Sequence, residues 1–215
     1  MDFFLKSIGA SNLTESIIMQ FPLGVDEKYC NKIVNRALLL NCLNKYYSEL
    51  WGELWQCNDD NWSSNDHRLS SMCELNNNWT WNCPLRYPFQ RRWASIEIDV
   101  ITALALRLTI EELILIYELQ FPVLQQNEDD TWYDQKGNIV FTCSKGLVGV
   151  GLDRPDWERV KDKQEGDLVT HTMTKSELYR GKQVTYYPPF TKCDRVEDYK
   201  RAWAFFEEKF KENLK

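Results

Sequence analysis

PFQRRWASIEIDVITALALRLTIEELILIYELQ, residues 88–120, is the stretch that decides the fold of this chain. Its first part predicts a helix from about Pro88 to Leu106. Thr109 and Glu112 then form a capping box that opens a further helix, which is expected to end near Gln120. Charged residues interrupt the apolar run too often for a membrane span, which needs about 20 predominantly apolar residues. The stretch therefore predicts two consecutive helices of a globular protein.

Similar signals predict helices upstream. Asn12 with Glu15 indicates a short helix to about Gln20, and Asp26 is placed to cap a long helix that runs to about Trp55. Apolar residues recur along this long helix at helical spacing, which favours a face packed in the core. The stripe includes Tyr29, Ile33, Val34, Ala37, Leu40, Leu43, Tyr47, Leu50 and Leu54.

The sequence changes character after residue 121. Two short β-prone runs flank a turn within residues 131–141, which predicts a hairpin. Residues 183–187 read as a strand, and a short helix is expected near Pro155. Asp194 opens a last helix that carries an apolar stripe.

These elements predict an α+β fold, mainly helical, with a small antiparallel β-hairpin or sheet in the C-terminal half. The helical region is expected to span 1–120, with a Trp-rich ordered loop or insertion at about 57–85. The smaller β-containing region is expected to span 121–215, where the C-terminal helix closes it. We expect both regions to form one compact unit.

Composition limits the possible functions. The chain has 215 residues, nine Trp and a net charge of −6. A domain that binds DNA alone is normally basic, so any nucleic-acid role here needs a local basic patch or a larger assembly. The seven Cys are odd in number and scattered, and no secretory signal precedes them, so we expect reduced thiols in the cytoplasm.

Metal and nucleophilic chemistry are weakly supported. Cys57, His67, Cys73 and Cys83 lie in the Trp-rich loop, but none of them pair at the two-to-four-residue spacing of structural zinc sites. His67 and His171 stand in no nucleophile motif, so a structural or surface role is expected for both. We predict no metal and no catalytic residue.

Two further patterns have competing interpretations. Glu128, Asp129, Asp130 and Asp134 are the carboxylates that a magnesium-dependent nuclease would need, or else form a solvated acidic turn. The glycines of residues 146–151 superficially resemble a cofactor loop, but a plain turn is favoured because no strand–turn–helix context surrounds them. No cofactor is predicted.

Base methylation is also disfavoured, because an Asn, Asp or Ser before Pro-Pro and an aromatic residue is needed to hold a flipped base. Here Tyr187 stands before Pro188-Pro189. We therefore expect no methyltransferase catalytic domain in this chain.

The strongest chemical pattern is basic and aromatic. Residues 85–93 place Arg86, Arg91 and Arg92 among three aromatic residues. Arginine suits phosphates and guanine edges, and aromatic rings stack on bases. In the alternative interpretation these arginines start a helix and pair with Glu97, Asp99 or other carboxylates of the protein itself.

Several runs together resemble a known family. The runs that carry the resemblance are spread over most of the chain. They are 91–100, 106–113, 116–117, 120–124, 130–134, 137–151 in part, 189–205 in part and, upstream, 36–47. These runs resemble the carboxy-terminal region of large single-chain, Type IIG-like bacterial restriction–modification DNA methyltransferases. Arg107 stands where that family usually has Gly. The resemblance implies that the catalytic part lies in another polypeptide or polypeptide region, and that this chain binds and positions.

We therefore predict a non-catalytic, DNA-engaging or target-recognition module of a restriction–modification or phage-defence methyltransferase. Its expected partners are double-stranded DNA within a larger assembly and the methyltransferase catalytic region, with no membrane involved. The predicted DNA contacts are Arg86, Arg91, Arg92, Lys145 and Arg154. The alternative is an assembly module that binds a methyltransferase or helicase partner through its Trp-rich surface without touching DNA.

Overall fold

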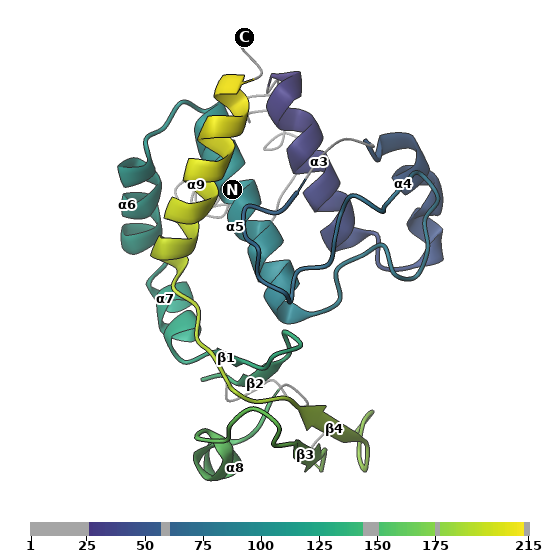
Figure 1. The fold of residues 1–215 in the computed structure, drawn as a ribbon, viewed down its shortest axis with the longest axis vertical. Coiled ribbons are helices and arrows are strands. Elements are labelled where there is room, and N and C mark those ends of the chain that lie inside the picture. Colours follow the sequence, from purple (N-terminus) through teal and green to yellow (C-terminus); the bar gives the residue numbers. More distant parts are fainter. Residues whose placement is uncertain (1–25, 57–60, 144–150, 175–176, 213–215) are drawn as a thin grey trace, which may run out of the picture.

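Helix α5 (Pro88–Ala105) lies between α3 (Glu27–Asn41) and α9 (Arg195–Glu212), and the three form the helical layer of the molecule (Figure 1). Pro88 begins α5, where a missing N–H removes no helical hydrogen bond. One side of α5 is buried at helical spacing against its neighbours and forms the centre of the larger hydrophobic core. The buried apolar residues of α5 are Phe89, Trp93, Ala94, Ile96, Val100, Ile101 and Ala103.

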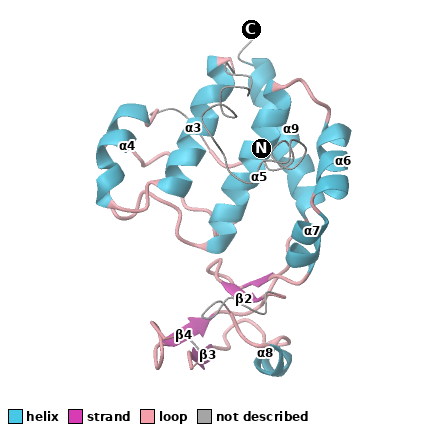
Figure 2. Ribbon diagram, turned by 180° about the vertical axis from the view of Figure 1, so that it is seen from behind, coloured by secondary structure: helices cyan, strands magenta, loops and turns pink. Residues whose placement is uncertain are grey.

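The computed structural model describes residues 26–56, 61–143, 151–174 and 177–212. The remaining elements are η1 (Lys45–Tyr47), α4 (Ser48–Leu54), α6 (Ile110–Gln120), α7 (Pro122–Asp129), β1 (Trp132–Tyr133), β2 (Ile139–Phe141), α8 (Arg154–Val160), β3 (Val169–Thr172) and β4 (Gln183–Tyr186). The fold is α+β and mainly helical, as predicted (Figure 2). The helix predicted over 12–20 lies outside the described residues. Within them, no helix combines the length and apolarity that a membrane crossing requires.

The long helix predicted from Asp26 to Trp55 is wrong, because the chain breaks between α3 and α4. Asn41 ends α3 with its side-chain amide donating to the carbonyl of Ala37, and Cys42 leaves helical geometry with ψ 56°. Asn44 then caps η1 by accepting from the N–H of Tyr46 at 3.0 Å. Asparagine competes for backbone hydrogen bonds in this way, and therefore favours helix ends over helix interiors.

The break changes which side chains after Asn41 are buried, and two residues outside the predicted stripe take the core positions. Trp51 and Trp55 point into the core and stack on each other with ring centroids 4.4 Å apart. Leu43, Tyr47, Leu50 and Leu54 of the predicted stripe are instead exposed, so the prediction that the whole stripe packs in the core is wrong at these four positions.

Helices α5 and α6 meet at the junction where Arg107 replaces glycine in the resemblance. Arg107 has φ 60°, and the N–H of Leu108 donates to the carbonyl of Ala103 at 2.9 Å, as in a Schellman motif. The predicted capping box follows: Thr109 Oγ1 accepts from Glu112 N, and the Glu112 carboxylate accepts from Thr109 N. This junction turns the chain directly into α6, as the sequence predicted.

The C-terminal half carries two small antiparallel sheets. Strands β1 and β2 form the predicted hairpin, and β4 pairs with β3, which the sequence did not reveal. A second hydrophobic core lies between these sheets and α8. Its buried members are Val140, Phe141, Leu152, Trp157, Val169, Tyr186 and Phe190. Helix α9 then returns the chain to the helical layer (Figure 1).

Candidate functional site

The three arginines of the basic-aromatic segment point in different directions. Arg91 is partly buried and donates from Nη1 to the carbonyls of Leu40, at 2.8 Å, and Leu85, at 3.1 Å. It therefore links the last turn of α3, where the carbonyls have no helical partner, to the loop before α5. In this position the Arg91 guanidinium joins two segments of the protein itself.

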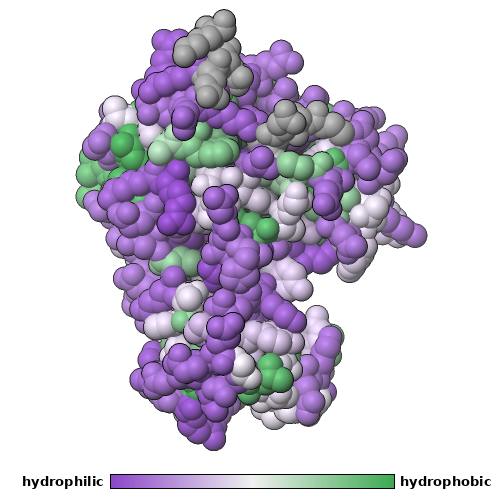
Figure 3. Space-filling model, viewed as in Figure 1, coloured by the Kyte–Doolittle hydropathy of each residue, from purple (hydrophilic) through white to green (hydrophobic). Residues whose placement is uncertain are grey.

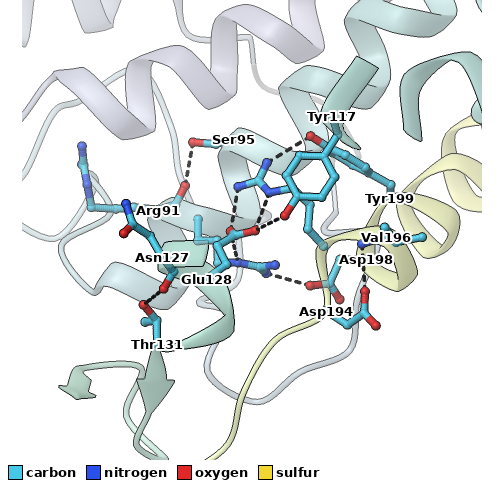
Figure 4. A network of polar contacts seen from close by, with 12 residues as sticks. Arg91, Ser95, Tyr117, Asn127, Glu128, Thr131, Asp194, Val196, Asp198 and Tyr199 are labelled. Carbon is cyan, nitrogen blue, oxygen red and sulfur yellow. Dashed lines mark hydrogen bonds and ion pairs between the residues drawn. The ribbon is translucent and has the colours of Figure 1, made fainter. Parts of the chain in front are cut away.

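Arg92 is buried in an ionic network between α5, α7 and α9. Its Nε donates to Glu128 at 2.8 Å, and its Nη1 donates to Asp198 at 2.7 Å. Figure 4 shows Glu128 beside Tyr117 and near Asp198. Burial alone would raise the pKa of Glu128, but the hydrogen bond from Arg195 and the two nearby guanidinium charges outweigh it and hold the pKa below its ordinary value.

Arg195 completes the same network from the first turn of α9. It donates to both carboxylate oxygens of Glu128, at 2.8 and 2.9 Å, and to Asp99 at 3.2 Å. Tyr199 also donates to Asp99, at 2.8 Å. Bidentate arginine–carboxylate pairing of this kind fixes geometry strongly, so the network holds the three helices in register.

A second buried pair fixes the Trp-rich loop. Arg36 of α3 and Glu97 of α5 form an ion pair with both side chains fully buried. Glu97 also accepts from Trp93 and from the backbone and hydroxyl of Ser63, at 2.6 to 3.0 Å. From Asn61 to Tyr87 the chain forms no helix or strand, as predicted, and these bonds attach it to the core.

The predicted internal partners of the arginines were therefore only partly right. Arg92 does pair with carboxylates, but they are Glu128 and Asp198. Glu97 and Asp99 instead pair with arginines of α3 and α9, which the local spacing in 85–99 does not reveal.

Arg86 differs from the other two because it is exposed. Its guanidinium lies over the ring of Trp81 at 3.6 Å and donates to the carbonyls of Trp81 and Leu43. Trp81 is itself 63% exposed. The pair therefore forms a flat cationic and aromatic element at the surface.

This element borders a larger group of exposed apolar side chains on η1 and α4, which we call the aromatic surface. Tyr46 is 85% exposed, and Tyr47, Leu50 and Leu54 follow at the spacing of one helix face. The aromatic surface consists of Leu43, Tyr46, Tyr47, Leu50, Leu54 and Trp81. Exposed apolar side chains are common singly, but a group of this kind is typical of an interaction site.

The expected solvated acidic turn is wrong for two of its four carboxylates, Glu128 and Asp134, whereas Asp129 is exposed. Asp134 is fully buried and accepts from the N–H groups of Lys136, Asn138 and Tyr187 and from the Asn138 amide, so it organises the turn. Glu128 belongs to the ionic network. Within the described residues, no group of three or more His, Cys, Asp and Glu is arranged to hold a metal ion.

The loop residues considered for zinc have separate partners. His67 lies 3.2 Å from the carbonyl of Gln135, and Cys73 donates to Asn61. Cys83 is buried against Thr80. Cys57 lies outside the described residues.

The second predicted group of DNA contacts is partly described. Lys145 lies outside the described residues, and so do Gly146 and Gly149. Arg154 is exposed, with its guanidinium over Phe141 at 4.7 Å and 3.8 Å from Glu158. Its neighbourhood is an ordinary helix start, because the Asp153 side chain caps α8.

Gly151 has a structural reason to be glycine. Its φ is +69°, and a Cβ at this position would lie 2.6 Å from the carbonyl oxygen of Val140. The residue therefore permits a close backbone approach to β2. Phe190, which follows the two prolines, also has a structural role, because it is buried against Trp157 in the second hydrophobic core.

The sequence interpretation did not single out Arg36, Asp198 or Arg195, and it considered Glu128 only for a metal site or an acidic turn. Glu97 carried a usable signal, because this charged residue falls on an otherwise apolar face of α5. Arg195 and Glu128 are 67 positions apart and carried none.

Comparisons with known proteins do not identify a family for this chain. No family model, no curated protein and no solved structure matches this chain.

Proposed function

We propose that this chain is a non-catalytic assembly module that binds a partner protein through its aromatic surface. The observation that carries the proposal is the exposure of Tyr47, Leu50 and Leu54, which follow one another on a single helix face and remain in solvent. Large aromatic and aliphatic side chains are the residues that dominate the energy of protein interfaces.

The arrangement of the arginines supports the same proposal. Arg92 is occupied by two carboxylates and Arg91 by two carbonyls. Of the basic-aromatic segment, Arg86 is the arginine that reaches the surface, and it lies beside the aromatic surface. Arginine next to aromatic residues is frequent in protein–protein hot spots.

The resemblance to restriction–modification methyltransferases suggests which partner to test. We propose that the partner is a methyltransferase catalytic polypeptide encoded next to this chain. In that arrangement the module positions the enzyme, and the chemistry takes place on the partner.

The test uses the full chain and that polypeptide, mixed and followed by sedimentation velocity. Tyr47→Ser combined with Leu50→Ser should weaken association by at least about tenfold, as expected when hot-spot residues are truncated. Leu168→Ser is the matched control, because Leu168 is also an exposed leucine but lies outside the aromatic surface. Equal loss in both variants, or association unaffected by either, would contradict the proposal.

DNA engagement is a second candidate, supported by the exposed Arg86–Trp81 pair. An aromatic ring beside a guanidinium suits a nucleobase and its phosphate. If Arg86 contacts phosphate, Arg86→Ala in the assembly should lower the slope of log affinity against log salt by about 0.9. An unchanged slope would leave the protein-binding role of Arg86 as the better interpretation.

A further inference from the structure

Helix α6 has a second exposed apolar face, distinct from the aromatic surface. Leu113 and Tyr117 are buried, whereas Leu115 and Leu119 are 52% and 66% exposed and Ile116 is also exposed. Figure 3 shows apolar side chains gathered over this helix at the left edge of the molecule. A helix that is apolar on nearly all sides is normally covered on all sides, so this face is suited to a partner.

The charged residues of α6 itself have one sign. From Leu108 to Gln135 the sequence contains seven acidic residues and no Lys, Arg or His. The seven are Glu111, Glu112, Glu118, Glu128, Asp129, Asp130 and Asp134. Glu128 and Asp134 are engaged inside the protein, whereas Glu111, Glu118 and Asp129 are exposed. Glu111 and Glu118 lie one turn before and after Leu115, on the border of the apolar face.

We propose that the Leu115–Leu119 face of α6 docks a basic amphipathic helix of a partner protein. The apolar side of that helix covers Leu115, Ile116 and Leu119, and its Lys or Arg side chains meet the acidic border. Helices commonly dock in this way, with apolar anchors at i, i+3 or i+4 and i+7. Complementary charge at the border provides orientation and specificity.

Charge also argues against other occupants. A second copy of this chain would place one acidic border against another, which is unfavourable. Nucleic acid and anionic lipid surfaces are repelled for the same reason.

The face lies on the opposite edge of the helical layer from η1 and α4. Figures 1 and 2, which view the molecule from opposite sides, both place α6 and α4 at opposite edges. Both surfaces are thus accessible at once, and the chain has the geometry of an adaptor between two partners. The α6 site does not depend on what binds the aromatic surface.

The probe is a fluorescent synthetic helix with Leu on one face and Lys on the others, titrated with the full chain at low salt and followed by anisotropy. Its counterpart carries Glu in place of Lys. The Lys helix should bind and the Glu helix should not. Leu115→Ser with Leu119→Ser should weaken binding of the Lys helix at least about tenfold.

Two further variants test how much the acidic border contributes to binding and whether binding is specific to the leucines of α6. Glu111→Gln with Glu118→Gln should weaken binding several-fold and flatten its salt dependence. Leu168→Ser with Leu178→Ser, which replaces exposed leucines elsewhere, should leave binding unchanged. The Tyr47→Ser and Leu50→Ser variant should also bind normally, so that failure of the aromatic surface and failure of this site are distinguishable.

Binding that survives the Leu115 and Leu119 substitutions would reflect charge attraction alone and would overturn the proposal. Binding of the Glu helix as tightly as the Lys helix would also overturn it. So would concentration-dependent dimers of the chain that these substitutions abolish, because the face would then be occupied by a second copy. All these substitutions lie at exposed positions, and an unchanged circular dichroism melt shows that the variants are folded.

Discussion

Arg92→Ala should strongly destabilise the protein, because it removes one partner from a buried network. Arg92 donates to Glu128 and Asp198, and the side chains of both carboxylates are only 13% exposed. Glu128 keeps the bidentate pair with Arg195, but Asp198 loses the guanidinium that it faces. Breaking a buried pair from one side costs roughly 3–5 kcal/mol, because a charge stays buried without its partner.

This loss is large relative to the stability of an ordinary domain, which is about 5–15 kcal/mol. Urea unfolding followed by tryptophan fluorescence should therefore show a much lower midpoint with an unchanged slope. Arg159→Ala is the control, because Arg159 is 72% exposed and pairs with Asp156 at the surface. Its expected effect is at most about 1 kcal/mol.

A double-mutant cycle of Arg92→Ala with Asp198→Ala then tests the pair itself. The coupling free energy should be roughly 1–3 kcal/mol, the usual range for residues in one buried network. If Arg92→Ala costs no more than Arg159→Ala, Arg92 is not held as described, and a role for it at the surface, including contact with DNA, becomes the better interpretation.

Three further predictions concern other parts of the molecule. Arg107→Gly should raise the free energy of unfolding by about 1 kcal/mol in urea titration, because a non-glycine residue is strained at φ 60°; a loss of stability would contradict the strain. Glu128→Gln should be most destabilising above the ordinary glutamate pKa of about 4.5, and its difference from the parent should shrink as pH falls through the lowered folded-state pKa; a difference independent of pH would contradict the ion pairs. At pH 8, iodoacetamide should label exposed Cys30 faster than Cys193, whose pKa burial raises to about 11, as read by peptide mass spectrometry; the reverse order would contradict the burial.

The local signals of the sequence predicted helix starts and the hairpin well. Helix α5, the capping box of α6, the β1–β2 hairpin and the cap of α9 all depend on residues within a few positions of one another, which sequence patterns capture. Strand β3 and helix α7 went unnoticed, because β3 is short and half-exposed and α7 has no buried stripe.

The candidate site was harder to predict, because its chemistry depends on partners that are distant in sequence. Arg92 and Asp198 are 106 positions apart, so the basic-aromatic segment alone could not distinguish a phosphate contact from an internal ion pair. The helix break at Asn41 had a similar effect. The helical spacing of apolar residues continues through the break, so it indicated a core face beyond Asn41. Tyr47, Leu50 and Leu54 nevertheless lie in solvent.

The acidic residues that give the chain its negative net charge fall into a buried group and an exposed group. Of the acidic residues, Glu97, Glu128, Asp134 and Asp198 neutralise buried arginines or satisfy buried backbone groups, so they contribute little field outside. The carboxylates that do reach solvent include Glu111 and Glu118, which border the apolar face of α6. Exposed charge near the aromatic surface has both signs, from Lys45 and Arg86 and from Glu49 and Glu53 of α4. The chain thus presents two apolar faces whose borders differ in charge, and long-range electrostatics should direct a basic partner to α6 rather than to η1 and α4.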